Sequence, residues 1–313
     1  METYELGSSG AEVAKIQTAL KGIGLYHGPI DAVFGGATEA AVRAFQKQSG
    51  QGVNGVVGAA TWASLLKGLI APPSISQQPL EYRCLALTGS FETSLPIPDC
   101  FAGLAGNFDG QGISFGALQW NLGTGTLQPL LLEMANGHPD VWTQLFAGGA
   151  VVLRQVLSEN RADQLQWADS IQHQNSLVEP WKGQFRALGR TPEFQTIEMR
   201  SALGVFGRAV ALRQNYQLSS SRATALMFDV VTQDGGIKPI ARAEILSDYQ
   251  SIAPSVTGGD LEIARMRSVA TRVAHSANPK YVPDVLARKM TIANGSGIVH
   301  GKRYTLSGYG LDV

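Results

Sequence analysis

Apolar residues recur at three- and four-residue intervals along most of the chain, which is the pattern of helices that bury one face. Near the N-terminus the recurring positions are Val13, Ile16, Leu20 and Ile23, followed by Ala41, Val42 and Phe45. We expect these two sets to form amphipathic helices, with a third short helix after residue 61. The first part of the chain is therefore predicted to be a small three-helix unit.

The segments that join these helices contain an internal repeat. Residues 30–38 match residues 53–61 at a constant offset of 23, and each copy ends in threonine. Because a threonine hydroxyl accepts hydrogen bonds from free N–H groups of a first helical turn, we predict that Thr38 and Thr61 are N-caps. Asp31 and Asn54 are expected to shape the turns through side-chain-to-backbone bonds.

Helical periodicity also dominates the longer, C-terminal part of the chain. We expect helices near residues 80–91, 127–137, 139–158, 160–174, 179–188, 192–216, 220–233, 239–252, 259–275 and 281–292. The only sheet expected is a small hairpin around 105–120, where Asp109-Gly110 is a turn signal. The pattern predicts a mainly α, α+β fold with one small β-hairpin.

A stretch rich in proline, serine and glutamine separates the two parts. Residues 70–79 lack periodicity, which indicates a linker. We therefore expect domains at 1–69 and 80–313.

Composition and charge exclude several classes of function. The 313 residues hold 25 basic and 25 acidic side chains, so neither nucleic acid nor an anionic membrane is the expected partner. No apolar run approaches the roughly 18 residues of a membrane span. The N-terminus shows no signal-peptide features, so phage-type release or delivery by a secretion machine is expected. Cys84 and Cys100 either pair or remain free thiols.

Cofactor and metal chemistry find no support in the sequence. The five histidines show no HExxH or paired ligand spacing, and there is no phosphate loop. No Cys–His or Ser–His signature of an amidase or peptidase occurs. We expect no cofactor and no metal, with His27 at the surface and His300 in a structural role.

Two carboxylates carry the strongest chemical signal. Glu92 ends the first predicted helix of the larger domain, and Asp109 follows in a Gly-rich stretch. Glycosidic bond cleavage commonly uses such a pair, one as acid and the other as base or nucleophile. Apolar surroundings would keep Glu92 protonated, as a general acid requires. The alternatives are an exposed helix-end glutamate and an Asp-Gly turn without a catalytic role.

Further polar residues are candidates for substrate binding. Those spaced along the predicted hairpin and the stretch after it are Ser114, Gln119, Trp120, Asn121 and Thr124. Trp120 either stacks on a sugar or belongs to the core. Asp229 and Gln233 lie four residues apart, on one face of an apolar helix. The Asp229 carboxylate is therefore either buried with a partner or directed into a cleft.

The N-terminal part resembles the three-helix peptidoglycan-binding domain found on many cell-wall hydrolases. The matching positions are 6–10, Val13, Gln17, Leu20, 24–31, Phe34-Gly35, Thr38, Ala41-Val42, Phe45-Gln46, Val57-Gly58 and Thr61-Trp62. Asn54-Gly55 stands where the family usually has Asp-Gly. The resemblance implies binding to peptidoglycan, although such domains sometimes serve only as packing modules.

A second resemblance covers about 35 residues of the larger domain. Family 46 chitosanases, of the lysozyme superfamily, carry a glutamate, a gap, Gly-Asp-Gly-Arg-Gly-Tyr-Thr-x-Gly and a Gly-Thr element. This chain has Glu92, then 108–116, then the Gly-Thr-Gly-Thr of 123–126. Gln111 replaces the arginine of that family and Phe108 its first glycine. The resemblance implies Glu92 as the acid and Asp109 as the second carboxylate.

Together these features predict a modular, monomeric, bacteriolytic wall enzyme of the muramidase or endolysin type. It would bind peptidoglycan and cleave β-1,4 bonds of the glycan. The alternatives are a lytic transglycosylase that uses Glu92 alone, a chitosanase-like glycosidase and a non-catalytic wall-binding protein.

Overall fold

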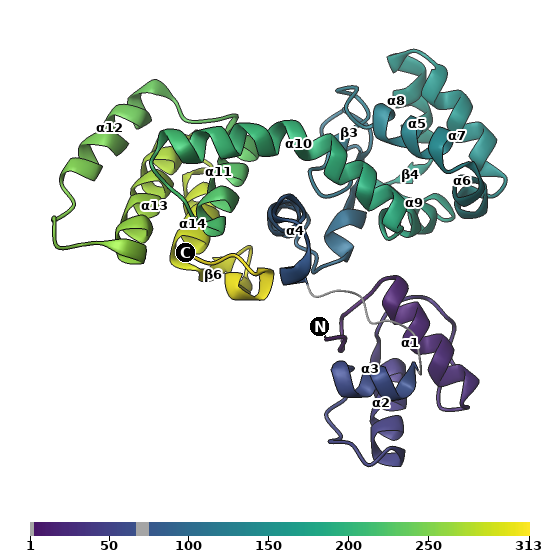
Figure 1. Ribbon diagram of the computed structural model, residues 1–313. Coiled ribbons are helices and arrows are strands. Elements are labelled where there is room, and N and C mark those ends of the chain that lie inside the picture. The colour runs from purple at the N-terminus through teal and green to yellow at the C-terminus, as the bar shows by residue number, and fades with distance from the viewer. Residues whose placement is uncertain (1–2, 67–74) are drawn as a thin grey trace.

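The computed structural model describes residues 3–66 and 75–313 (Figure 1). Residues 4–66 contribute an apolar core of their own, which is separate from two larger cores formed after residue 75. Much of the predicted linker at 70–79 lies outside the described residues. Its last part forms the 3-10 turn η1 (Ile75–Gln77), in which Ile75 is buried against the larger domain.

The N-terminal domain consists of three helices, α1 (Ala11–Gly22), α2 (Gly36–Gln48) and α3 (Ala59–Leu65). Most of the predicted apolar positions enter its core, together with Phe34 and Trp62. Ile23 does not, because α1 ends at Gly22 and the Ile23 side chain is 52% exposed.

The prediction of threonine N-caps is wrong. The N-cap positions are Gly35 and Gly58, and neither helix has a side-chain cap. Thr38 and Thr61 lie three residues further on, where their hydroxyls face the domain interior and are buried. There they accept hydrogen bonds from the buried side chains of Gln17 (3.2 Å) and Gln46 (3.3 Å).

These two glutamines each hold one copy of the repeated turn. Gln17 Nε2 also donates to the Asp31 carboxylate and the Val33 carbonyl. Gln46 Nε2 makes the corresponding bonds to the Asn54 side chain and the Val56 carbonyl. The repeat seen in the sequence is therefore a repeat of buried hydrogen bonding, with an amide replacing the carboxylate at Asn54.

We predict that Gln46→Leu lowers the free energy of unfolding of the N-terminal domain by about 2–4 kcal/mol. The change leaves several buried donors and acceptors without partners, each at a cost of about 1–3 kcal/mol. Hydrogen exchange of the α2 backbone amides in the full chain, followed by mass spectrometry, measures the difference for this domain alone. Gln48→Leu, on an exposed position of the same helix, is the control. Equal stability of the two variants would contradict the prediction.

The larger domain has helices near all ten predicted places. They are α4 (Leu80–Thr93), α5 (Gln128–Gly137), α6 (Pro139–Phe146), α7 (Gly149–Ser158), α8 (Arg161–Ser170), α9 (Trp181–Gly189), α10 (Pro192–Asn215), α11 (Ser221–Asp234), α12 (Pro239–Gln250), α13 (Gly258–His275) and α14 (Val282–Asn294). The single helix predicted at 139–158 is two helices, because Ala147 takes a left-handed conformation with φ of 46°. The mainly helical fold class is confirmed.

The small sheet near the start of this domain has three antiparallel strands. They are β1 (Leu104–Ala105), β2 (Ser114–Phe115) and β3 (Trp120–Asn121), in that order. Asp109-Gly110 lies in the eight-residue loop between β1 and β2, and not at a two-residue turn.

The prediction of only one β-hairpin is wrong, since two more occur. One pairs β4 (Gln172–His173) with β5 (Ser176–Leu177), and the other pairs β6 (Ser296–Val299) with β7 (Lys302–Thr305). The β4–β5 strands are too short for a visible alternation of apolar and polar residues. At the β6–β7 turn a histidine, His300, takes positive φ in place of the usual Asn or Gly.

Helix α10 connects two lobes, each with its own core (Figure 1). Its start contributes Phe194 and Ile197 to one core, and further along the helix Ala202 and Ala209 enter the other. Helix α4 and the three-stranded sheet lie beside the point where the lobes meet, and Trp120 packs against both cores.

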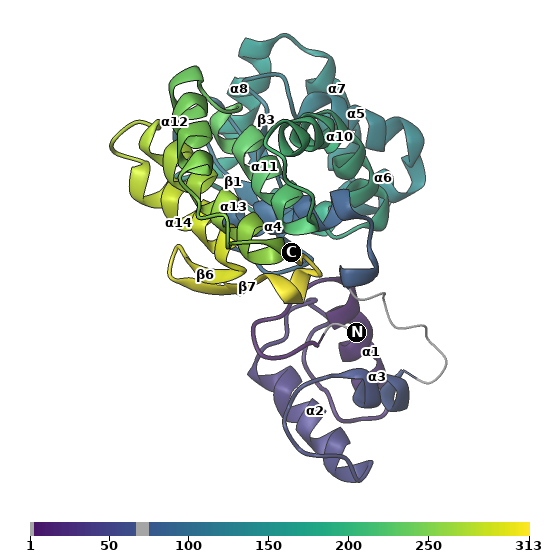
Figure 2. The same ribbon diagram turned by 60° about the vertical axis from the view of Figure 1, so that its left-hand side comes forward.

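The view in Figure 2 shows the N-terminal domain on the side of the larger domain that carries the β6–β7 hairpin. Cys84 and Cys100 are both buried free thiols. Within residues 3–66 and 75–313, no helix combines the length and apolarity needed to cross a membrane.

Candidate functional site

The last turn of α4 carries Glu92 and is pressed against the three-stranded sheet. A side chain at Gly103, just before β1, would place its Cβ 2.1 Å from Thr93 Cγ2. Only glycine therefore permits this close approach. The sheet and the end of α4 form one packed unit, which sets where Glu92 lies relative to the loop after β1.

Glu92 is bound by a buried arginine. Arg288 on α14 donates from Nη1 to Glu92 Oε1 at 2.8 Å, and its side chain is only 3% exposed, whereas that of Glu92 is 28% exposed. The guanidinium also stands over the ring of Phe91, 5.4 Å from its centroid. The surroundings of Glu92 are therefore not purely apolar: a cation holds one of its oxygens. The other oxygen, Oε2, has no hydrogen-bond partner among the described residues.

Arg288 is held in turn by Asp229, which is fully buried on α11. Arg288 Nη2 lies 2.6 Å from Asp229 Oδ1, and Lys289 Nζ lies 3.1 Å from Oδ2. Burial would raise the pKa of Asp229, but the charges of Arg288 and Lys289 outweigh burial and lower the pKa to about 2. Of the two alternatives expected for Asp229, the structure has the buried one. Asp229 is linked to Glu92 through Arg288, and it also accepts from Thr88 Oγ1 on α4 at 3.3 Å.

Gln233 belongs to the same network. Its Oε1 accepts from Lys289 Nζ at 2.6 Å, and its Nε2 donates to Asp284 Oδ2 at 3.1 Å. Lys289, which is fully buried, also pairs with Asp234 Oδ2 at 2.8 Å. Asp229 and Gln233 therefore lie on one helix face as predicted, and they use that face to hold the cations of α14.

Asp109 lies exposed in the β1–β2 loop, which is anchored at both ends. Asn107 Nδ2 donates to Asp169 on α8, and Gly112 N donates to Asn107 Oδ1. Asp109 Oδ1 accepts from Gln111 N at 3.0 Å, and Gln111 Oε1 accepts from Arg161 Nη2 of α8 at 2.8 Å. Gln111 stands where the chitosanase motif has an arginine, and its side chain binds the guanidinium of Arg161 from α8.

Three of the predicted binding residues bond to one another at the edge of the sheet. Asn121 Nδ2 donates to Ser114 Oγ at 2.9 Å, and Thr124 N donates to Asn121 Oδ1 at 3.0 Å. Gln119 donates from Nε2 to the carbonyls of Gly103 and Gly116 and so holds the turn between β2 and β3. Trp120 is partly buried between the two cores. Binding of substrate by these residues remains a prediction.

A buried glutamate under this turn was not found by sequence reasoning. Glu198, in the middle of α10, is fully buried, and its Oε2 accepts from Ala117 N at 3.0 Å. Burial raises the pKa of the Glu198 carboxyl well above the usual range. A Cβ at Gly116 would lie 2.6 Å from Glu198 Oε1, which explains glycine at this place in the motif. The sequence around Glu198 shows only a helical pattern, so nothing in it indicates this contact with the turn.

Sequence reasoning also missed Arg288, Lys289 and Asp284 as residues of the candidate site. Asp284 Oδ1 lies 2.5 Å from His300 Nε2, and His300 Nδ1 lies 3.1 Å from the carbonyl oxygen of Phe91. Asp284 and Tyr281 line a pocket of about 280 Å³ at the start of α14. This pocket lies one helical turn from Arg288 along α14. The described residues contain no cluster of three or more metal-binding side chains.

Comparisons with known proteins give different matches for the two parts of the chain. Residues 9–65 match the family model described as a putative peptidoglycan binding domain. The chain thus has a peptidoglycan-binding domain at its N-terminus, followed by a mainly helical domain with a network of charged residues around Glu92.

Similar proteins are known for both parts of the chain. The spore cortex-lytic enzyme of Bacillus cereus is 41% identical over 66 residues, which are 21% of this chain and 26% of that enzyme. The chain therefore spans about a quarter of that relative. A chitosanase from Bacillus subtilis MY002 is similar in structure, with 16% identity, a TM-score of 0.46 and coverage of 73% and 98% of the two chains. A family 46 chitosanase of Gynuella sunshinyii, solved with chitotetraose, has 15% identity, a TM-score of 0.44 and coverage of 74% and 99%.

We predict that Asp229→Asn lowers the free energy of unfolding by about 3–5 kcal/mol at pH 7, because it leaves buried cations without their counter-charge. The lowered pKa of Asp229 means that its contribution is complete above pH 3.8 and is lost as the pH falls toward about 2. Between pH 3.8 and about 2, the free energy of unfolding of Asp229→Asn should therefore fall less than that of the wild type. Guanidinium unfolding at several pH values measures both effects.

The matched control is Glu133→Gln. Glu133 pairs with Arg200, but both side chains are exposed, at 41% and 61%. Exposed pairs contribute about 0–1 kcal/mol. If Asp229→Asn cost no more than Glu133→Gln, the buried network would not support the fold as described.

Proposed function

We propose that this protein binds peptidoglycan through its N-terminal domain and cleaves the β-1,4 bonds of the glycan strands at Glu92. The single observation that carries the proposal is the setting of Glu92. The carboxylate is partly exposed at the end of α4, one oxygen is held by the buried Arg288, and the other is free. The peptidoglycan-binding domain on the same chain favours the wall as the substrate.

In the proposed reaction Glu92 donates a proton to the leaving oxygen of the glycosidic bond. The bond from Arg288 fixes the plane of the carboxylate, so Oε2 is the oxygen that would carry the proton. Asp229 acts through Arg288 as a positioning residue, since it is fully buried and cannot touch a sugar.

Asp109 is the proposed second carboxylate. Its Oδ1 accepts from Gln111 N, while Oδ2 has no hydrogen-bond partner among the described residues. The group is exposed, and its loop is fixed by α8. An exposed, anchored carboxylate of this kind can activate a water molecule or stabilise an oxocarbenium-like transition state.

Peptidoglycan is favoured over chitosan as the substrate. A polymer of glucosamine is cationic and would be attracted by a strongly acidic protein, whereas this chain has zero formal net charge. A lytic transglycosylase is the second candidate, because Glu92 alone, with its free Oε2, suffices as both acid and base.

We expect purified peptidoglycan treated with the protein to release soluble disaccharide muropeptides with reducing ends. Glu92→Gln should lower the rate by about 10²- to 10⁴-fold, since glutamine has no proton to give. Mass spectrometry of the fragments measures the product, and Glu159→Gln, at an exposed site in the other lobe, is the control. Anhydro-sugar ends would identify a transglycosylase. Free peptides would overturn the glycosidase proposal.

Asp109→Asn separates one-carboxylate from two-carboxylate chemistry. Asparagine keeps the oxygen that accepts from Gln111 N, so the loop is retained, but the negative charge is lost. We expect lysis to fall by about 10²-fold or more. Lysis near the wild-type rate, with sedimentation on the wall unchanged, would exclude Asp109 from the reaction.

A further inference from the structure

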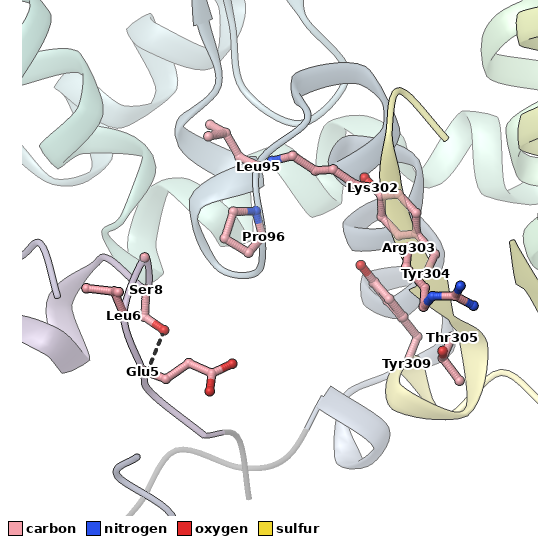
Figure 3. A pocket seen from close by; sticks show the side chains of 11 residues that line it. Glu5, Leu6, Ser8, Leu95, Pro96, Lys302, Arg303, Tyr304, Thr305 and Tyr309 are labelled. Carbon is pink, nitrogen blue, oxygen red and sulfur yellow. Dashed lines mark hydrogen bonds between the residues drawn. The ribbon is translucent and has the colours of Figure 1, made fainter. Parts of the chain in front are cut away.

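A pocket of about 400 Å³ lies where the N-terminal domain meets the larger domain (Figure 3). Three segments line it: 5–8 before α1, Leu95-Pro96 directly after α4, and the β6–β7 hairpin with the 3-10 turn η3 (Leu306–Tyr309). Leu95 is three residues beyond Glu92, and three residues of chain span at most about 11 Å. The pocket is therefore close to the proposed acid.

The larger domain supplies a fixed wall. Lys302 Nζ donates to the carbonyl of Ser94, which ends α4. The Tyr304 hydroxyl donates to the Ser90 carbonyl at 3.0 Å, and the Tyr309 hydroxyl donates to Ser90 Oγ at 3.3 Å. All three bonds attach the C-terminal segment to the last turns of α4, so this wall keeps a constant position relative to Glu92.

The N-terminal domain supplies the opposite wall, which is also fixed. Glu5 N donates to Ser8 Oγ at 3.0 Å, and Gly7 N donates to the Phe34 carbonyl at 2.9 Å. The Glu5 carboxylate itself has no hydrogen bond or ion pair within the described residues. Figure 3 shows it directed from the backbone toward the side of Tyr309. A carboxylate without a bonded partner among the described residues therefore lines the pocket, together with the cations of Lys302 and Arg303.

The remaining lining combines the exposed cation of Arg303, beside Lys302, with an apolar, branched part. Leu6 is 60% exposed and Leu95 is 36% exposed, and Pro96 lies beside them. Tyr304 is buried and packs edge-on against Phe91, so it offers no open face for a sugar ring. Small methyl-bearing side chains suit such a lining better than a pyranose does.

We propose that this pocket binds the stem peptide of peptidoglycan, a short peptide of alanine, glutamate and a diamino acid. This inference rests on the proposed function and names a second part of the same substrate. The Glu5 carboxylate binds the free ammonium of the diamino acid, and Leu6, Leu95 and Pro96 contact alanine methyl groups. Lys302 supplies positive charge for the carboxylates of the peptide.

The reach of the peptide agrees with this placement. A peptide of four extended residues spans about 14 Å. Glu92 and Leu95, three residues apart, are separated by at most about 11 Å, so the peptide is long enough to reach the pocket. A glycan strand bound at Glu92 can therefore place its own stem peptide between the two domains. The N-terminal domain would then help to select peptide-bearing strands in addition to holding the wall.

The test uses the full chain and two probes, the peptide Ala-γ-Glu-Lys-Ala and the same peptide acetylated on the lysine amine. Calorimetric titration gives the affinity of each. Glu5→Gln is expected to weaken binding of the free-amine peptide by about three- to fivefold, as for an exposed ion pair. Acetylation should weaken wild-type binding by the same factor and leave Glu5→Gln unaffected. Glu39→Gln removes a partly exposed carboxylate that pairs with Arg43 on α2, away from this pocket, and should change nothing.

Equal affinity of wild type and Glu5→Gln for the free-amine peptide would overturn the proposal, as would no binding of the peptide to wild type. Failure of this site is distinguishable from failure of the proposed function. If Glu92→Gln abolishes lysis while Glu5→Gln has no effect on peptide binding, only the pocket assignment fails. If Glu92→Gln leaves lysis intact while Glu5 controls peptide binding, only the glycosidase assignment fails.

Discussion

The buried guanidinium of Arg288 is the interaction on which the candidate site depends. It joins α14 to α11 through Asp229 and to α4 through Glu92, three helices that are far apart in the sequence. A charge at this depth is tolerated only because it is paired and hydrogen-bonded on both sides. The same pairing that stabilises the lobe therefore fixes the carboxylate that faces solvent.

The small sheet depends on close backbone approaches rather than on its length. Its two-residue strands bury little surface, so contacts at glycine positions hold it: Gly103 against Thr93 and Gly116 against Glu198. Asp109 and Glu92 are thus supported from different lobes, because α8 anchors the Asp109 loop while α14 anchors Glu92. Helix α10, which enters both cores, sets the relation between these lobes.

The two domains meet near the end of α4 that carries Glu92, at the pocket proposed to bind the stem peptide. Hydrogen bonds from Lys302, Tyr304 and Tyr309 hold the C-terminal segment against α4. The turn at Glu5–Ser8 lies opposite them across the pocket. A wall fragment bound by both domains would be held at its glycan and its peptide together, and binding at two linked places raises the effective local concentration of substrate.

The sequence by itself determined the helices, the repeat and the two carboxylates, because each depends on residues close together in the chain. Apolar spacing predicts α10 and α13 almost to the residue, and the 23-residue offset marks both turns of the N-terminal domain. Only the tertiary structure decided that Thr38 and Thr61 bond to glutamines, that Asp229 is buried, and that Arg288, Glu198 and Asp284 surround the site. These contacts join residues separated by tens to hundreds of positions, and a buried charge has no local pattern until its partner is in place.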